Sequence, residues 1–343
     1  MESLELRNCS ESIQASTTPE SLKLVFAVIM AFMAIAGTLG NTLLIAAVAV
    51  YDKLRSVHNI FIVNLAVADL FVTTLVIPFA IVGAIGNGSF FCQHDAICQV
   101  MGLLLVVSCG TSVWSIASIA IERYIYICYN HVYFKIYNRV TFPIIIVCIW
   151  VYAFLLDLPN FVGWGEHLFK VELLACTFRP VRGYIWFINV FGGGIPFLIL
   201  SFCYTQIYLF VRRVSFKQFI LRRASSDSTS TITGIKSADK HLLKILAVII
   251  LFFVLMWTPF MWLMLVNSYT PLPHWLLYIC GNLCLANSAV NFWIYAFNKD
   301  FRDGYLFIIK RIKRQKKGEE KIVEETKDKK RAVYDNVVDD TKL

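Results

Sequence analysis

The sequence predicts an all-α membrane protein, a seven-transmembrane helix bundle followed by a short amphipathic eighth helix. Of the 343 residues, 58% are hydrophobic and 16% are charged, with a mean hydropathy of +0.64, whereas soluble domains are roughly 45–50% apolar and about 25% charged. Seven continuous apolar segments each reach the length of about 20 residues that a spanning helix needs, and they lack the alternation of a β-barrel. The segments are Leu24–Val50, Asn59–Ile85, Ala96–Cys128, Phe142–Phe161, Tyr184–Val211, Leu242–Asn267 and Trp275–Phe297.

Basic residues in the loops predict the orientation of the bundle. Lys and Arg gather in segments 51–58, 129–141 and 212–241, and the loops on the opposite side offer few. Because the side richer in Lys and Arg stays in the cytoplasm, we expect a multi-pass protein of the plasma membrane with an extracellular N-terminus. That orientation suits Asn8 as a glycan acceptor. The net charge of +9 is then explained by anionic lipid headgroups and not by nucleic acid.

The pattern divides the chain into four parts. These are an extracellular N-terminal tail (1–23), the bundle (24–298), an amphipathic helix on the inner membrane surface (299–314) and a disordered cytoplasmic tail (315–343). The amphipathic helix is predicted from apolar residues at helical spacing among basic ones; they are Phe301, Tyr305, Ile308, Ile309 and Ile312. The ending Thr341-Lys342-Leu343 resembles a ligand for a PDZ domain.

Polar side chains recur inside the predicted spans. They are Asn41, Asp69, Ser112, Asn287, Ser288 and Asn291. Such residues usually face the bundle interior, where they can simply hold helices together. Asp69 requires more, because a bare carboxylate in lipid is costly and needs a cation, a proton or several donors. No Cys and His grouping has the spacing of a structural metal site, so none is expected.

Each span also carries a short motif. The motifs are Gly40-Asn41, Asn64 to Leu70, Glu122-Arg123-Tyr124, Trp150, Pro196 with Tyr204, Phe253 with Trp257-Thr258-Pro259, and Asn287-Ser288 with Asn291 and Tyr295. In this order the chain resembles the rhodopsin-like (class A) G-protein-coupled receptors over Leu24 to Arg314. The resemblance implies a receptor, not an enzyme, that needs no cofactor and couples an extracellular small-molecule ligand to a heterotrimeric G protein.

The resemblance further implies roles by position. A pocket for an allosteric sodium ion would consist of Asp69, Ser112, Asn287, Ser288 and Asn291. Activation and G-protein contact would involve Glu122, Arg123, Tyr124, Tyr204, Asp239 and Tyr295. At rest Arg123 would pair with Glu122, and Asp239 is a second candidate partner. A packing switch beneath the ligand would consist of Val113, Pro196 and Phe253. A disulfide between Cys98 and Cys176 is implied, and pairing of Cys9 with Cys92 is left open.

Within this superfamily the chain looks most like the melatonin receptors. The likeness is carried by Asn59 to Val63, Arg123 to Cys128, Leu158-Pro159-Asn160, Cys176-Thr177-Phe178 and Asn298 to Arg302. It implies that Asn160 holds the ligand by a hydrogen bond and Phe178 by stacking. The chain departs from the pattern at Gly192 and Pro180, where the family has histidine and glutamine, and at Phe292, where melatonin receptors have alanine. Asp157 is either a counter-ion for a cationic ligand or a headgroup-facing carboxylate.

The predicted ligand cavity is mostly apolar, which suits a small neutral or lipophilic ligand, although the same residues could be ordinary core. Its residues would be Asn160, Phe178, Leu105, Cys109, Gly192, Trp257, Phe260, Met261, Met264, Tyr278 and Asn282. Retinal is disfavoured because residues 274–298 contain no lysine, and simple amines because Leu105 stands where amine receptors have aspartate. A ligandless receptor-like modulator is an alternative. A channel or transporter is opposed by the absence of an internal repeat.

Overall fold

The structure is a computed structural model that describes residues 20–56, 59–170, 173–179, 181–224, 237–315 and 317. The predictions for Asn8 and Cys9, for most of the tail and for the PDZ-like ending fall outside these residues. Helix α11 includes Asp239, but the side chain of Asp239 is also outside the described set.

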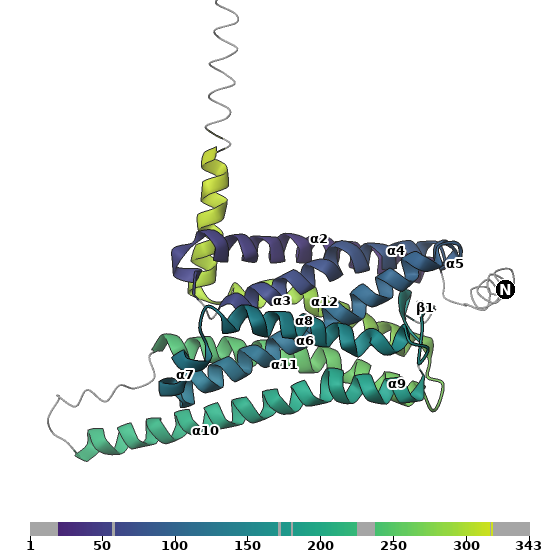
Figure 1. Ribbon diagram of the computed structural model, residues 1–343. Helices are drawn as coiled ribbons and strands as arrows, with labels where there is room; N and C mark the ends of the chain where they lie inside the picture. Colours follow the sequence, from purple (N-terminus) through teal and green to yellow (C-terminus); the bar gives the residue numbers. More distant parts are fainter. Residues whose placement is uncertain are drawn as a thin grey trace, which may run out of the picture.

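A bundle of long helices forms the body of the molecule (Figure 1). The helices of the spans are α2 (Glu20–Val50), α3 (Ile60–Phe71) with α4 (Ile77–Ile85), α6 (Asp95–Cys128), α8 (Thr141–Asp157), α9 (Arg182–Phe187) with α10 (Ile195–Ala224), α11 (Ser237–Asn267) and α12 (His274–Tyr295). Within the described part of the chain, six segments are long and apolar enough to cross a bilayer, and Leu251–Asn267, the apolar part of α11, supplies the seventh. The predicted seven-helix bundle is therefore confirmed.

Two of the spans contain a π-helical turn immediately before a proline. The second contains η3 (Val72–Val76), followed by Pro78, and the fifth contains η5 (Ile188–Gly194), followed by Pro196. Proline has no N–H to donate to the carbonyl four residues earlier, so the preceding turn loses a regular hydrogen bond and widens. The spans therefore continue across both sites as bent helices.

Short elements connect the spans. They are η1 (Asp52–Leu54), α5 (Ser89–Gln93), α7 (Asn130–Ile136), η4 (Leu158–Asn160), β1 (His167–Lys170) and β2 (Ala175–Phe178). The two strands pair in antiparallel fashion, with His167 opposite Phe178. They add a β-hairpin to a chain that the sequence predicts to be all-α. In Figure 1 this hairpin lies at the end of the bundle opposite α7.

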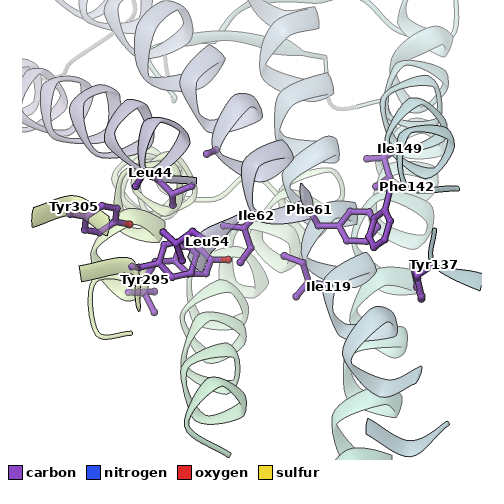
Figure 2. Packing of buried hydrophobic residues seen from close by; sticks show 14 of the residues in the cluster. Leu44, Leu54, Phe61, Ile62, Ile119, Tyr137, Phe142, Ile149, Tyr295 and Tyr305 are labelled. Atoms are coloured by element: carbon purple, nitrogen blue, oxygen red, sulfur yellow. The ribbon is translucent and has the colours of Figure 1, made fainter. Parts of the chain in front are cut away.

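The end of the bundle near α7 is closed by a large apolar cluster. Figure 2 shows its side chains converging from the first inner loop, the helices and the C-terminal segment. The labelled members are Leu44, Leu54, Phe61, Ile62, Ile119, Tyr137, Phe142, Ile149, Tyr295 and Tyr305. Helices in a membrane associate through van der Waals packing of such side chains, so the cluster joins the ends of the helices near α7 to one another.

Residues 299–315 form the predicted eighth helix, which crosses the end of the bundle at a steep angle (Figure 1, yellow). Phe301, Tyr305 and Ile308 are buried against the bundle, at the spacing of one helix face. Ile309 and Ile312 instead remain 41% and 48% exposed. The predicted apolar stripe therefore divides into a face packed on the bundle and an exposed face, and contact of the exposed face with the membrane stays a prediction.

Phe292 packs the seventh helix against both the first and the eighth. Its ring lies 5.0 Å from that of Tyr305, centroid to centroid. A Cβ atom added at Gly40 would come within 2.6 Å of the Phe292 ring. Glycine at position 40 therefore creates the space that Phe292 fills.

We predict that Gly40→Ala lowers the stability of the protein by about 1–3 kcal/mol, the usual effect of overpacking a core. An alanine inside a helix would otherwise be stabilising, so a lower Tm of the purified protein identifies the packing effect. Gly40→Ala combined with Phe292→Ala should regain part of the lost Tm. An unchanged Tm in the single variant contradicts the assigned contact.

Candidate functional site

A cavity of about 650 Å³ lies between the third, fifth, sixth and seventh helices. Eight of the predicted ligand residues line it: Leu105, Cys109, Phe178, Gly192, Trp257, Phe260, Met261 and Met264. Most of the other lining side chains are apolar too. The size and character suit a small ligand held mainly by apolar contact.

The β-hairpin forms the roof of this cavity. Ala175, Thr177 and Phe178 of β2 line the cavity and are at most 9% exposed. A disulfide joins Cys98 at the start of α6 to Cys176 in the same strand. The implied Cys98–Cys176 bond is thus present, and it fixes the roof to the third helix. Cys92 is also disulfide-bonded, but Cys9 lies outside the described residues.

Three predicted ligand residues do not line the cavity. Asn160 donates from Nδ2 to Oδ1 of Asp157 at 2.8 Å. Tyr278 packs its ring 4.7 Å from that of Phe26, and Asn282 donates to the backbone oxygen of Tyr278 at 2.7 Å. Their side chains are occupied by neighbours in the fold. Helix periodicity could not reveal this, because it gives the approximate face of a residue but not its partner.

Asp157 is neither a counter-ion in the cavity nor a headgroup-facing carboxylate. Its side chain is 0% exposed and its Oδ2 lies 2.9 Å from Nε2 of His167. No sequence pattern indicates this pair, because the nine residues between the partners include the loop that leads into the hairpin.

The cavity floor rests on the side chains implied as a packing switch. Val113 and Phe253 both line the cavity and belong to one buried cluster with Leu200. Phe253 stacks on Trp257 with 5.8 Å between ring centroids. A ligand on this floor would therefore contact the sixth helix close to Pro259, where the missing N–H weakens the helix.

The residues implied as a sodium pocket are brought together around Asp69. Its Oδ1 accepts a hydrogen bond from Ser112 at 3.1 Å and its Oδ2 accepts one from Asn291 at 2.8 Å. Ser288 also donates to this carboxylate, and Asn287 is buried on the same helix. These side chains come from the second, third and seventh helices, so the carboxylate links three spans.

Two further buried amides tie the spans together. Asn41 donates to the backbone oxygen of Ser288 at 3.0 Å, which joins the first and seventh helices. Asn64 donates to Ser115 at 2.8 Å and accepts from Trp150 at 2.9 Å, which joins the second, third and fourth. Both act as the helix-packing contacts expected of intramembrane amides.

At the inner end, Glu122 and Arg123 form an ion pair with both side chains at most 6% exposed. The atoms Oε2 and Nε are 3.1 Å apart. Tyr133 of α7 donates to the other carboxylate oxygen of Glu122 at 2.8 Å. Burial and the Glu122 charge raise the pKa of the Tyr133 phenol, so it stays a donor at neutral pH. Sequence analysis missed Tyr133, although its place among aromatics after the Glu-Arg-Tyr motif was a weak signal.

The remaining residues implied in activation lie near this pair or at its edge. Tyr204 and Tyr295 pack in the apolar cluster of Figure 2, and within the described part of the chain their phenol oxygens have no hydrogen-bond partner. Tyr124 turns outward, with its hydroxyl 3.4 Å from that of Tyr129. The prediction that Asp239 joins Arg123 falls on a side chain outside the described set.

Comparisons with known proteins agree with this architecture. The family model described as "7 transmembrane receptor (rhodopsin family)" matches residues 40–295. Melatonin receptor type 1A of Mus musculus is 31% identical over 301 residues, covering 85% of this chain and 82% of that receptor. Melatonin receptor type 1B-B of Danio rerio is 28% identical over 316 residues, covering 90% and 88%.

Among solved structures, squid rhodopsin matches with a TM-score of 0.73 and 22% identity, covering 87% of this chain and 88% of that one. This likeness shows the fold alone. The family model, in contrast, covers the bundle from the first span to the seventh, and the mouse relative matches most of both chains. The chain therefore belongs to the rhodopsin family of seven-transmembrane receptors and is related within it to the melatonin receptors.

Proposed function

We propose that this receptor sits in the plasma membrane with its N-terminus outside, binds a small neutral or lipophilic molecule in the roofed cavity, and activates a heterotrimeric G protein. The proposal rests on one observation: the ligand cavity is connected through the helices to the Asp69 network and to Arg123. Val113 of the cavity floor lies on α6, the helix that also carries Ser112 of the Asp69 network and Arg123, and it packs with Phe253 of α11 in one buried cluster. A ligand that binds one arrangement of these helices better than another shifts the population of the whole bundle.

The ion pair of Glu122 and Arg123 supports an inactive resting state. Arg123 is 5% exposed and held by a neighbour on its own helix. Release of Arg123 toward the cytoplasm would expose a cation to the G protein, and the phenols of Tyr204 and Tyr295 could then gain partners. Coupling is therefore reciprocal, since a G protein that binds the released state must also raise ligand affinity.

A sodium ion fits the Asp69 site because a carboxylate with hydroxyl oxygens around it offers the ligands that hard cations prefer. Asp69, Ser112 and Ser288 supply such oxygens. The ion would neutralise a charge that is otherwise costly to bury. It would stabilise the arrangement in which the second, third and seventh helices converge.

We predict that replacing N-methylglucamine chloride by sodium chloride raises the Tm of the purified receptor by roughly 2 °C, the shift expected from binding worth under 1 kcal/mol. Asp69→Asn should abolish this difference. Ser108→Ala, a buried change on α6 one helical turn before Ser112 and outside the network, serves as the control and should keep the difference. A sodium effect that survives in Asp69→Asn contradicts the site.

Arg123→Ala should abolish receptor-stimulated nucleotide exchange on the G protein, because the cation that would leave the ion pair is gone. Its Tm should fall, because Glu122 is left buried without its cation, so exchange is compared at equal amounts of folded receptor. The assay measures guanine-nucleotide exchange with purified receptor and G-protein subtypes, with Arg139→Ala as a control for loss of a general basic charge. Unchanged exchange in Arg123→Ala would contradict the proposed contact of Arg123 with the G protein.

Tyr133→Phe should raise agonist-free exchange roughly fivefold, since removing one donor from Glu122 weakens the resting state by about 1 kcal/mol. Tyr137→Phe alters the neighbouring ring, 5.2 Å away, without touching the bond to Glu122, and should behave like the wild type. Equal or lower basal exchange in Tyr133→Phe would contradict a role for this hydroxyl in the resting state.

A further inference from the structure

A second buried carboxylate lies at the outer end of the bundle, away from the Asp69 network. Asp157, the last residue of α8, is 0% exposed, and its partner His167 in β1 is 1% exposed. Their side chains meet at 2.9 Å between Oδ2 and Nε2. A buried carboxylate is stable only when its oxygens are fully hydrogen-bonded. This pair is therefore a built feature of the outer end and not a surface contact.

Two more donors complete the environment of Asp157. Asn160 donates from Nδ2 to Oδ1 at 2.8 Å, and the hydroxyl of Tyr184 lies 3.4 Å from the same oxygen. His167 donates to this carboxylate from Nε2, which leaves Nδ1 on the far side of the ring. Among the described residues, Nδ1 has no hydrogen-bond partner. Each oxygen of the carboxylate thus has one close donor, His167 at Oδ2 and Asn160 at Oδ1, and the Tyr184 hydroxyl lies between Oδ1 and the backbone oxygen of Leu156, which is 3.2 Å away.

Two glycines leave the space that the side chains of His167 and Asn160 occupy. The imidazole of His167 lies against Gly102 of α6, and the Oδ1 end of Asn160 lies against Gly165. A Cβ atom at either glycine would overlap with these side chains. The amide of Asn160 is therefore held by Asp157 at Nδ2 and confined by Gly165 at Oδ1, which has no hydrogen-bond partner among the described residues.

The group stands directly behind the cavity wall. Leu156, one helical turn before Asn160, lines the cavity, and so does Phe178, the cross-strand partner of His167. Asn160 does not line it. Among the polar lining residues, Asn189 already donates from Nδ2 to the backbone oxygen of Ile185 at 2.9 Å.

We propose that Asp157 and His167 are specificity-determining residues of this receptor, because they hold the Asn160 amide outside the ligand cavity. The inference rests on the proposed ligand-binding function of the cavity. It predicts that the natural ligand is a neutral lipophilic molecule recognised by its hydrocarbon or aromatic surface, without a hydrogen bond to Asn160. Asp157 and His167 act through Asn160 and need not touch the ligand themselves.

The test is a gain of function in the full-length receptor. Asp157→Leu with His167→Leu removes the two partners of the ion pair together, so that neither is left as an unpaired buried group, and it takes away the acceptor of the Asn160 amide. The freed Asn160 can then reach the cavity. Tritiated melatonin serves as the probe because it is a neutral indole with hydrogen-bonding groups at both ends.

We expect the double variant to bind the probe at least about tenfold more tightly than the wild type, which corresponds to roughly one good hydrogen bond. Adding Asn160→Ala to the double variant should remove the gain. Asp157→Asn keeps a carbonyl oxygen for Asn160 and should remain like the wild type. Equal binding in the wild type and the folded double variant, including no binding in either, overturns the proposal.

Two further results separate this inference from the receptor function. Loss of probe binding on Asn160→Ala in the wild type would also overturn it, because Asn160 would then already serve the cavity. Nucleotide exchange is measured on the same preparations without ligand. Failure of every form to stimulate exchange counts against G-protein coupling, whereas the comparison of probe binding still decides the role of Asp157.

Discussion

A carboxylate at mid-membrane depth that only the protein can solvate is the constraint on which the bundle depends. Asp69 is 0% exposed, and its hydrogen bonds come from Ser112 on the third helix and Asn291 on the seventh. In lipid the alternative to these bonds is an unpaired charge, which is far more costly than the net value of any one bond. A cation that bound this site would therefore be coupled to movement of the three helices.

The outer carboxylate meets the same constraint in a different way. Asp157 takes its donors from His167, Asn160 and Tyr184, which belong to the hairpin, to η4 and to α9. Those donors complete its environment without an ion, and Gly102 and Gly165 leave no spare room beside them. We expect the contacts of Asp69 to change when the helices move, whereas the contacts of Asp157 hold the roof of the cavity in place.

Single residues distinguish the cavity and the seventh helix of this receptor from the family pattern, while the fold is shared. Gly192 in the fifth helix adds cavity surface without a polar group. Phe292 fills the space over Gly40 and contacts Tyr305. Each change is accommodated by a neighbour that leaves room or supplies a partner, because packed interiors do not tolerate voids or overlaps. The cavity and the seventh helix thereby differ from the pattern that the motifs predict.

The sequence alone determined the seven spans and the eighth helix, since length, apolarity and helical spacing are local properties that lipid enforces. It also placed Asp69, Ser112 and Asn291 in three spans whose polar faces must turn inward. Only the tertiary structure decided that Asn160 serves Asp157 instead of the cavity, that Tyr133 holds Glu122, and that a hairpin forms the roof. These contacts join residues from different elements, and a partner across the fold leaves no periodic trace in the sequence.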